Sequence, residues 1–276
     1  MSVSMSALAW AKDMVVLDRL RSDEGSVGDS FAIDELLCKR VGEGESPVCH
    51  LWRHPRAFVM GTKDSRLPGA ADGVRWLHGA GYEAIVRGSG GAAVPLDDGV
   101  VNVSLILPAS GELAHGFRDD FGRMVALIKL ALLEHGLTVR YGEVEGSYCP
   151  GDYDLHIDGF KFCGISQRRQ VKAMIVQAFV NVEGSGDDRA LLVRGFYERA
   201  GVSADPSEYP DVIAGRMTSL QERGFLGDGD TSLARSFADA VIGALQAAPA
   251  SDSLLPDAAA IAEMRERLAA RYPLPR

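Results

Sequence analysis

The sequence predicts an α/β protein of the α+β type, with a mixed central β-sheet flanked by helices and a helical tail at the C-terminus. Three observations support this fold class. Strand-like and helix-like apolar patterns alternate as far as Pro210. The run from Val100 to Leu107 is apolar and β-branched, which is typical of a strand that crosses a core. Beyond Pro210, apolar residues recur only at helical spacing.

The first part of the domain is predicted to contain one helix and several strands. Ser30 is a candidate cap for a helix over Phe31–Arg40, where apolar residues have helical spacing. Pro55 separates two apolar runs within Val48–Met60, which favours two strands joined by a turn. The further strands predicted here are Tyr82–Arg87 and Val100–Leu107.

The second part is predicted to contain a long helix, a hairpin and further elements. The amphipathic pattern of Phe117–His135 predicts a helix that Gly136 ends. Tyr153–Ile157 alternates, Asp158-Gly159 is a strong turn signal, and Phe160–Ile165 forms the returning strand. The remaining elements are one strand and four helices, at Ala173–Val182, Asp187–Ala200, Val212–Arg223, Ser232–Ala247 and Ala258–Arg271.

The composition is that of an ordinary globular protein. With 276 residues, of which 46% are hydrophobic and 24% charged, the chain suits one large domain or a domain with a small appendage. No apolar run approaches the roughly 20 residues of a membrane-spanning helix, and Lys12 and Asp13 interrupt the first segment. We expect a cytoplasmic protein that binds no membrane. The net charge of −9 argues against nucleic-acid binding, and the one tight basic cluster comprises Arg168, Arg169 and Lys172.

Cys149 is the candidate nucleophile. Pro150 and Gly151 follow it and take the backbone out of regular pairing, so the thiol is expected on an exposed loop. An exposed thiol near a cation is the setting in which thiolate chemistry occurs. The four cysteines show no C-x-x-C spacing, so neither a disulfide framework nor a zinc site is favoured. The other three, Cys38, Cys49 and Cys163, are expected in the core.

Two further features lie near strand ends. Lys161 follows the predicted turn, where it is either a solvated lysine or a fixed cation that stabilises a thiolate or an oxyanion, or relays a proton. Residues Arg87–Gly91 (R-G-S-G-G) precede a strand and lack the Gly-Lys-Ser/Thr of a phosphate-binding loop, so nucleotide binding is unsupported. The glycines form either a tight turn or a backbone that approaches a ligand closely.

No metal ion or cofactor is predicted. Strand alternation would place Asp154, His156 and Asp158 on one face without paired-histidine spacing, and we interpret them as solvent-side residues. His50 and His54 are likewise expected at the surface or as caps.

Several motifs in order along the chain resemble the biotin/lipoate protein ligase and lipoyl/octanoyl transferase superfamily. They are V-R-G-S-G-G-A-A-V (86–94), D-x-G-V-V-N-V-S (97–104) and G-S-Y-C-P-G-x-Y-D-L (146–155). Within the superfamily, the resemblance is to the lipoyl amidotransferases, the octanoyl-[glycine cleavage H protein]:protein N-octanoyltransferases. That branch is also indicated by G-x-x-D-x-R-L-P (61–68), G-x-K-F-x-G-I-S-Q-R-R (159–169) and Y-P-D-V (209–212).

The resemblance implies a biotin/lipoate protein ligase-like catalytic domain over residues 28–212 and a C-terminal helical extension over 213–276 packed on it. It implies a hydrophobic tunnel for a medium-length acyl chain, with Cys149 as the acyl-accepting nucleophile and Lys161 as the lysine found across the superfamily. The implied substrate-binding residues are Arg87, Ser89, Gly90, Gly91 and Gly164.

The implied reaction moves an octanoyl group from the lipoyl-lysine of the glycine cleavage H protein to lysines of the lipoyl domains of 2-oxoacid dehydrogenase acyltransferase subunits. Gly88, Ala92 and Pro95-Leu96 depart from the paired arginines, third glycine and histidine of other branches. These departures are compatible with the amidotransferase branch and argue against an ATP-using ligase. The alternatives are an octanoyl-acyl carrier protein:protein octanoyltransferase, an ATP-dependent lipoate-protein ligase, and a noncatalytic carrier-protein binder.

Overall fold

The computed structural model describes residues 8, 10–21, 25–109, 117–246, 248–249 and 254–276. Its helices are α1 Val27–Gly42, α2 Ala70–Gly79, α3 Phe117–Ala131, α4 Gly186–Ala200, α5 Leu233–Leu245 and α6 Ala258–Arg271, with 3₁₀ turns η2 Asp64–Arg66, η4 Leu133–His135, η5 Pro206–Glu208 and η6 Gln221–Arg223. Its strands are β1 Val15–Arg19, β2 Val48–Trp52, β3 Arg56–Met60, β4 Glu83–Val86, β5 Val94–Asp97, β6 Val100–Pro108, β7 Arg140–Tyr141, β8 Leu155–Ile157, β9 Phe160–Arg169, β10 Ala173–Asn181 and β11 Ala248–Pro249.

The described strands form two sheets. The larger sheet has eight strands in the order β11-β1-β2-β6-β10-β9-β8-β7, and the smaller has the order β4-β3-β5. The larger sheet is mixed, because β1 runs parallel to β2 and β11 while the remaining neighbours are antiparallel. Its centre is the β6–β10 pair, in register from Val100↔Asn181 to Pro108↔Ala173. The predicted mixed central sheet with flanking helices is confirmed.

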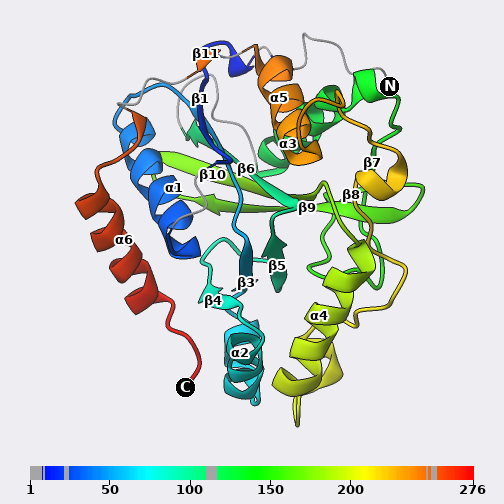
Figure 1. Ribbon diagram of the computed structural model, residues 1–276. Helices are drawn as coiled ribbons and strands as arrows, with labels where there is room; N and C mark the ends of the chain where they lie inside the picture. Colours follow the sequence, from blue (N-terminus) through cyan, green and yellow to red (C-terminus); the bar gives the residue numbers. More distant parts are fainter. Residues whose placement is uncertain (1–7, 9, 22–24, 110–116, 247, 250–253) are drawn as a thin grey trace.

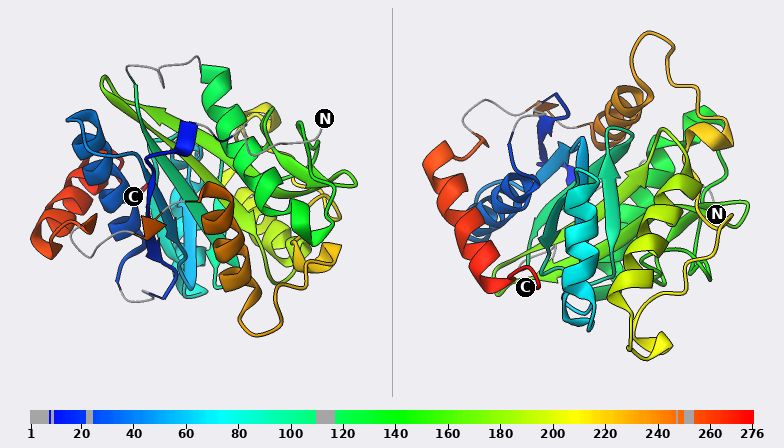
Figure 2. Two further views of the ribbon diagram at one scale, coloured as in Figure 1. Left: turned by 90° about the horizontal axis from the view of Figure 1, so that it is seen from above. Right: turned by 60° about the horizontal axis from the view of Figure 1, so that its bottom comes forward.

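Helices cover both faces of the larger sheet (Figures 1 and 2). The alternation of β6 divides its side chains between these faces. Leu105 and Leu107 pack with α3 and α5 in one apolar cluster, whereas Ile106 packs with α1 in another. A third cluster joins the smaller sheet to α2 and α4 and reaches Trp52 and Phe179 of the larger sheet. The smaller sheet therefore forms a wall opposite β2 and β10.

Most predicted elements are present, but α1 begins earlier than expected. Its cap is Ser26, whose hydroxyl accepts the Gly28 N–H while the Asp29 carboxylate accepts the Ser26 N–H. This reciprocal capping box satisfies N–H groups that the helix leaves without partners. Ser30, the predicted cap, is buried within the helix. The two strands predicted within Val48–Met60 exist, yet they belong to different sheets.

Several elements were not predicted, and one predicted helix is wrong. The unpredicted strands are β1, β5 and the two-residue β7 and β11, and the unpredicted α-helix is α2. Because β5 precedes β6, the glycine-rich loop joins β4 to β5. Of the predicted Val212–Arg223 helix, only η6 is helical. Gly215 has a φ of +75°, which a helix excludes. The chain around it instead runs along β9, where Lys161 N–H donates to Arg216 O and Thr218 N–H to Lys161 O.

The C-terminal helices contact different parts of the fold. Residues of α5 pack in the apolar cluster that contains α3. Helix α6 lies beside α1, where Arg265 forms an ion pair with Asp29 (Figure 1). The division into 28–212 and 213–276 stays a prediction. Among the helices of the described residues, none combines the length and the apolar composition that crossing a membrane requires.

Candidate active site

Cys149 lies in the loop between β7 and β8, as predicted, but its side chain is buried. The residue is 8% exposed, and its φ of 48° lies in the left-handed region that few residues other than glycine adopt. The Tyr148 ring anchors the preceding position, because it is fully buried and its hydroxyl pairs with Asn181. Ile213 N–H donates to Gly146 O and ties the loop to the segment after α4. The thiol is therefore held in a fixed direction inside the protein.

Two donors converge on the Cys149 sulfur from the glycine-rich loop. The Ala92 N–H lies 3.3 Å from Sγ and Arg87 Nη2 lies 3.4 Å from it. Arg87 also donates to Gly90 O at 3.0 Å and to Ala92 O at 2.9 Å, so it holds the loop closed around the thiol. Both donors are placed to hydrogen-bond a negative charge on the sulfur.

Lys161 is fully buried near the start of β9, directly behind the Cys149 loop. Its ammonium donates to Cys149 O at 2.6 Å and Tyr148 O at 2.8 Å, and it pairs with Asp154 Oδ2 at 2.8 Å. Three oxygens thus occupy the three N–H donors of the ammonium. Lys161 contacts the backbone of the cysteine, while Arg87 and Ala92 contact its sulfur.

The interpretation of Asp154 as a solvent-side residue is wrong. Asp154 is 2% exposed, and its carboxylate also accepts the Gly151 N–H at 3.1 Å. The alternation did not apply because β8 begins at Leu155 and carries a register irregularity there. Burial raises the pKa of Asp154 to about 6, although the Lys161 ammonium acts in the opposite direction. Asp158 is exposed, as predicted, and His156 is half-buried.

The other predicted side chains are distributed as follows. His50 is not at the surface: it is fully buried and pairs with Asp34 at 2.8 Å. His54 accepts the Arg56 N–H, consistent with a capping role. The thiols expected in the core, those of Cys38, Cys49 and Cys163, are buried and unpaired.

A small cavity of about 20 Å³ lies beside the Cys149 sulfur. Its walls are mainly apolar and come from the smaller sheet, with Val94 and Leu96, and from Phe179 of the larger sheet. Gly164 forms part of the floor, where a Cβ would come within 2.5 Å of the Phe179 ring. The thiol thus opens on an apolar space.

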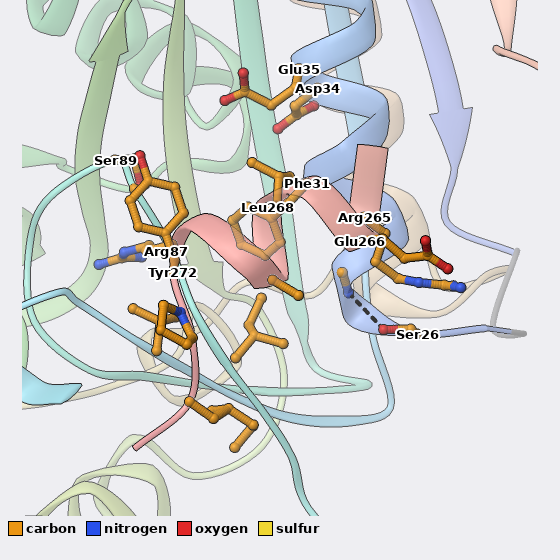
Figure 3. Close-up of a pocket in the computed structure, with 18 of the residues that line it drawn as sticks. Ser26, Phe31, Asp34, Glu35, Arg87, Ser89, Arg265, Glu266, Leu268 and Tyr272 are labelled. Atoms are coloured by element: carbon orange, nitrogen blue, oxygen red, sulfur yellow. Dashed lines mark hydrogen bonds between the residues drawn. The ribbon is translucent and has the colours of Figure 1, made fainter. Parts of the chain in front are cut away.

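A larger cavity of about 490 Å³ adjoins the small one (Figure 3). Phe31, Arg87 and Gln177 line both. Ser89 lines the larger cavity, and its hydroxyl accepts a hydrogen bond from the Ser166 hydroxyl at 3.4 Å. The outer wall comes from α6 and the C-terminal residues, whose Tyr272 accepts a hydrogen bond from Arg168. Nothing in the local sequence around Tyr272 indicated this position.

Gly91 and Gly90 provide a matched pair of substitutions. Their φ values are +78° and +79°, so alanine strains both backbones by a similar amount, about 1–2 kcal/mol. A Cβ at Gly91 would lie 2.9 Å from Cys149 Sγ and 2.8 Å from Arg87 Nη2, whereas Gly90 faces open space. We expect Gly91→Ala to slow alkylation of Cys149 by iodoacetamide, measured by mass spectrometry, far more than Gly90→Ala does. Equal rates in the two variants would contradict this expectation.

Comparison with known proteins identifies the family to which the chain belongs. Residues 26–232 match the model of the lipoyl protein ligase A/B catalytic domain. The fold is also found in a lipoate-protein ligase A bound with ATP, with a TM-score of 0.64, 17% identity and 92% of each chain covered. A bi-partite lipoate protein ligase of Thermoplasma acidophilum gives a TM-score of 0.63 at 17% identity, over 92% of this chain and 90% of that one. The chain belongs to the lipoyl protein ligase A/B catalytic domain family.

Curated relatives define the group within this family. A protein of Anoxybacillus flavithermus is 45% identical over 195 residues, 70% of each chain. One of Geobacillus kaustophilus is 44% identical over 196 residues, 70% of this chain and 69% of that one. Both are named octanoyl-[GcvH]:protein N-octanoyltransferase. The predicted resemblance to the lipoyl amidotransferases is confirmed, and with it an enzyme of the protein N-octanoyltransferase type.

Proposed function

We propose that this chain transfers an octanoyl group from the lipoyl-lysine of the glycine cleavage H protein to lysines of apo lipoyl domains in 2-oxoacid dehydrogenase complexes, through a thioester on Cys149. The observation that carries the proposal is the buried sulfur, which meets Ala92 N–H and Arg87 on its polar side and an apolar cavity on the other. The names of the relatives support the octanoyl group and the donor protein. The acceptor is the one that the resemblance to the lipoyl amidotransferases implies, and its lysine provides the amine that the thioester acylates.

In the first half-reaction, the Cys149 thiolate attacks the carbonyl carbon of the donor amide. The tetrahedral oxyanion is stabilised by backbone N–H groups and by Lys161, which turns from one of its carbonyl acceptors. The carbon–nitrogen bond then breaks, and the proton lost by the thiol reaches the leaving lysine amine through Lys161 and Asp154. An octanoyl thioester remains on Cys149.

In the second half-reaction, an uncharged lysine amine of the acceptor attacks the thioester carbonyl. The carbon–sulfur bond breaks, the new amide forms, and the amine proton returns to the sulfur through the same residues. One amide is exchanged for another, so the overall free-energy change is small and ATP is not needed. Aminolysis of the thioester is the downhill half.

The octanoyl chain is proposed to enter the apolar cavity beside the sulfur. That cavity, at about 20 Å³, has room for little more than one water-sized group. Phe31 lines both this cavity and the larger one, and we propose that a rotation of its ring joins the two when the chain enters. We propose that Gly91 and Gly164 keep the approach to the sulfur open, and that Ser89 and Gly90 shape the loop around the chain.

A transfer assay tests the proposal. The purified chain is incubated with octanoylated H protein and an apo lipoyl domain, without ATP, and the intact masses of all three proteins are followed. We expect octanoate to leave the H protein, appear on the chain and accumulate on the lipoyl domain. Transfer that requires octanoyl-acyl carrier protein, or octanoate with ATP, would replace the proposal with the corresponding alternative.

A cytoplasmic location is part of the proposal, because the four cysteines are free thiols, as in reducing compartments.

The activity is expected to fall on acidification because of Asp154. Above its pKa of about 6 the carboxylate is charged and holds the Lys161 ammonium, and below that pH it is neutral and the ion pair is lost. The rate of transfer should therefore decrease through this pH. Asp154→Asn should lower the rate and remove the step near pH 6. Asp158→Asn is the control, since Asp158 is exposed on the same hairpin. A step that persists in Asp154→Asn would assign it to another group.

A further inference from the structure

The polar side of the Cys149 pocket is a loop without regular secondary structure. Residues 87–93 connect β4 to β5, and the Ala92 N–H reaches the sulfur from this loop. A backbone N–H helps a thiolate only when its direction is fixed, because hydrogen bonds weaken steeply with angle. Within the loop, Arg87 donates to Gly90 O and Ala92 O, and further hydrogen bonds reach the loop from other elements.

Support comes from the residue next to Ala92. The Ala93 N–H donates to the Tyr197 hydroxyl at 3.1 Å, and that hydroxyl donates to Asp64 Oδ1 at 2.9 Å. The other carboxylate oxygen, Oδ2, accepts the Gly61 N–H at 2.7 Å. Tyr197 belongs to α4 and Asp64 to η2, so two elements far apart in the sequence meet at this loop.

The same turn also touches the loop sterically. A Cβ on Gly61 would lie 2.0 Å from Gly91 O, so the two backbones are in direct contact at this point. Gly61 thus contacts the loop directly at Gly91 O, and Asp64 reaches it through the Tyr197 hydroxyl. The three hydrogen bonds fix Ala93 on a rigid base.

A contribution to folding stability does not by itself explain why the buried Asp64–Tyr197 pair is polar. Asp64 is 2% exposed and Tyr197 is 3% exposed. The bonds that hold the carboxylate come from two neutral donors. Burial raises the pKa of Asp64, although these two bonds and the charge of Arg87 act in the opposite direction. Burying such a group is costly, and an apolar pair of the same shape would fill the space at no such cost. A role in orienting the loop explains why polar groups occupy this place.

We propose that Asp64 and Tyr197 are positioning residues, whose hydrogen-bonded pair holds Ala93 and thereby directs the Ala92 N–H at the Cys149 sulfur. This inference rests on the proposed function, because the Ala92 N–H is useful there only if Cys149 is the nucleophile. Both residues lie outside the predicted site, although Asp64 belongs to the G-x-x-D-x-R-L-P motif.

Tyr197→Phe tests the proposal directly. The ring packs against Phe196 and Tyr209, so phenylalanine keeps the packing and removes only the hydroxyl. Alkylation of Cys149 by iodoacetamide is measured against pH by mass spectrometry of its peptide. Losing one oriented donor should slow alkylation at neutral pH about five- to tenfold and move the pH midpoint upward. Tyr209→Phe, which removes a hydroxyl from the adjacent stacked ring, is the matched control.

Asp64→Asn is the second variant. An amide has one acceptor oxygen, so it cannot serve both the Tyr197 hydroxyl and the Gly61 N–H. The same upward shift of the pH midpoint is expected. An alkylation profile equal to that of wild type in either variant, with the fold intact by circular dichroism, would overturn the proposal. The assay contains no octanoyl substrate, so this outcome is independent of whether wild type performs the proposed transfer.

Discussion

Replacement of Cys149 by alanine is expected to abolish octanoyl transfer, with a loss of about 10⁴-fold or more, because a nucleophile that forms a covalent intermediate has no substitute. The change removes one atom from a side chain that is already buried, so the fold should survive. Intact mass spectrometry after mixing with the octanoylated donor should show no octanoyl adduct on the variant. Wild type should carry one.

Cys38→Ala is the control for this experiment. Cys38 is 1% exposed in α1, and burial raises the pKa of its thiol to about 12, which leaves it without thiolate at neutral pH. The variant should therefore form the adduct as wild type does. Cys149→Ser should keep the loop geometry and fail to transfer at a useful rate, since a hydroxyl is a far weaker nucleophile. Full transfer by either Cys149 variant would exclude the thioester route.

The local features of the site could be predicted from the sequence. Pro150 and Gly151 indicated a loop at Cys149, and the Asp158-Gly159 turn placed Lys161 at the start of a returning strand. These inferences depended on neighbours along the chain, which determine backbone geometry directly. Exposure did not follow from the same signals, because the glycine-rich loop and the smaller sheet cover Cys149.

The long-range features could not be predicted in this way. Tyr197 and Asp64 are 133 positions apart and meet only because α4 and η2 both pack against α2. The Val212–Arg223 segment has buried apolar residues at Val212, Met217 and Leu220, and this spacing resembles a helix. Its backbone instead bonds to Lys161 in β9, a choice made by tertiary contacts. Sequence periodicity indicates which residues are buried, but it does not indicate which element of the fold they pack against.

Lys161→Met is expected to have the second-largest effect, on both stability and activity. Methionine keeps much of the length of the side chain but removes the three N–H donors. The Asp154 carboxylate and the carbonyls of Tyr148 and Cys149 then lose their partner in a buried site. Breaking a buried ion pair on one side costs about 3–5 kcal/mol of stability. The melting temperature should fall, and octanoyl transfer should fall by about 10³-fold through loss of oxyanion stabilisation and of the proton relay.

A double variant separates the two effects. Adding Asp154→Asn to Lys161→Met removes the unpaired charge, so much of the lost melting temperature should return. Transfer should not return, because neither an ammonium nor a carboxylate remains to move a proton to the leaving amine. Recovery of activity together with stability would show that Lys161 only supports the Cys149 loop. Recovery of stability alone would assign the lost rate to the chemistry of the Lys161–Asp154 pair and not to support of the loop.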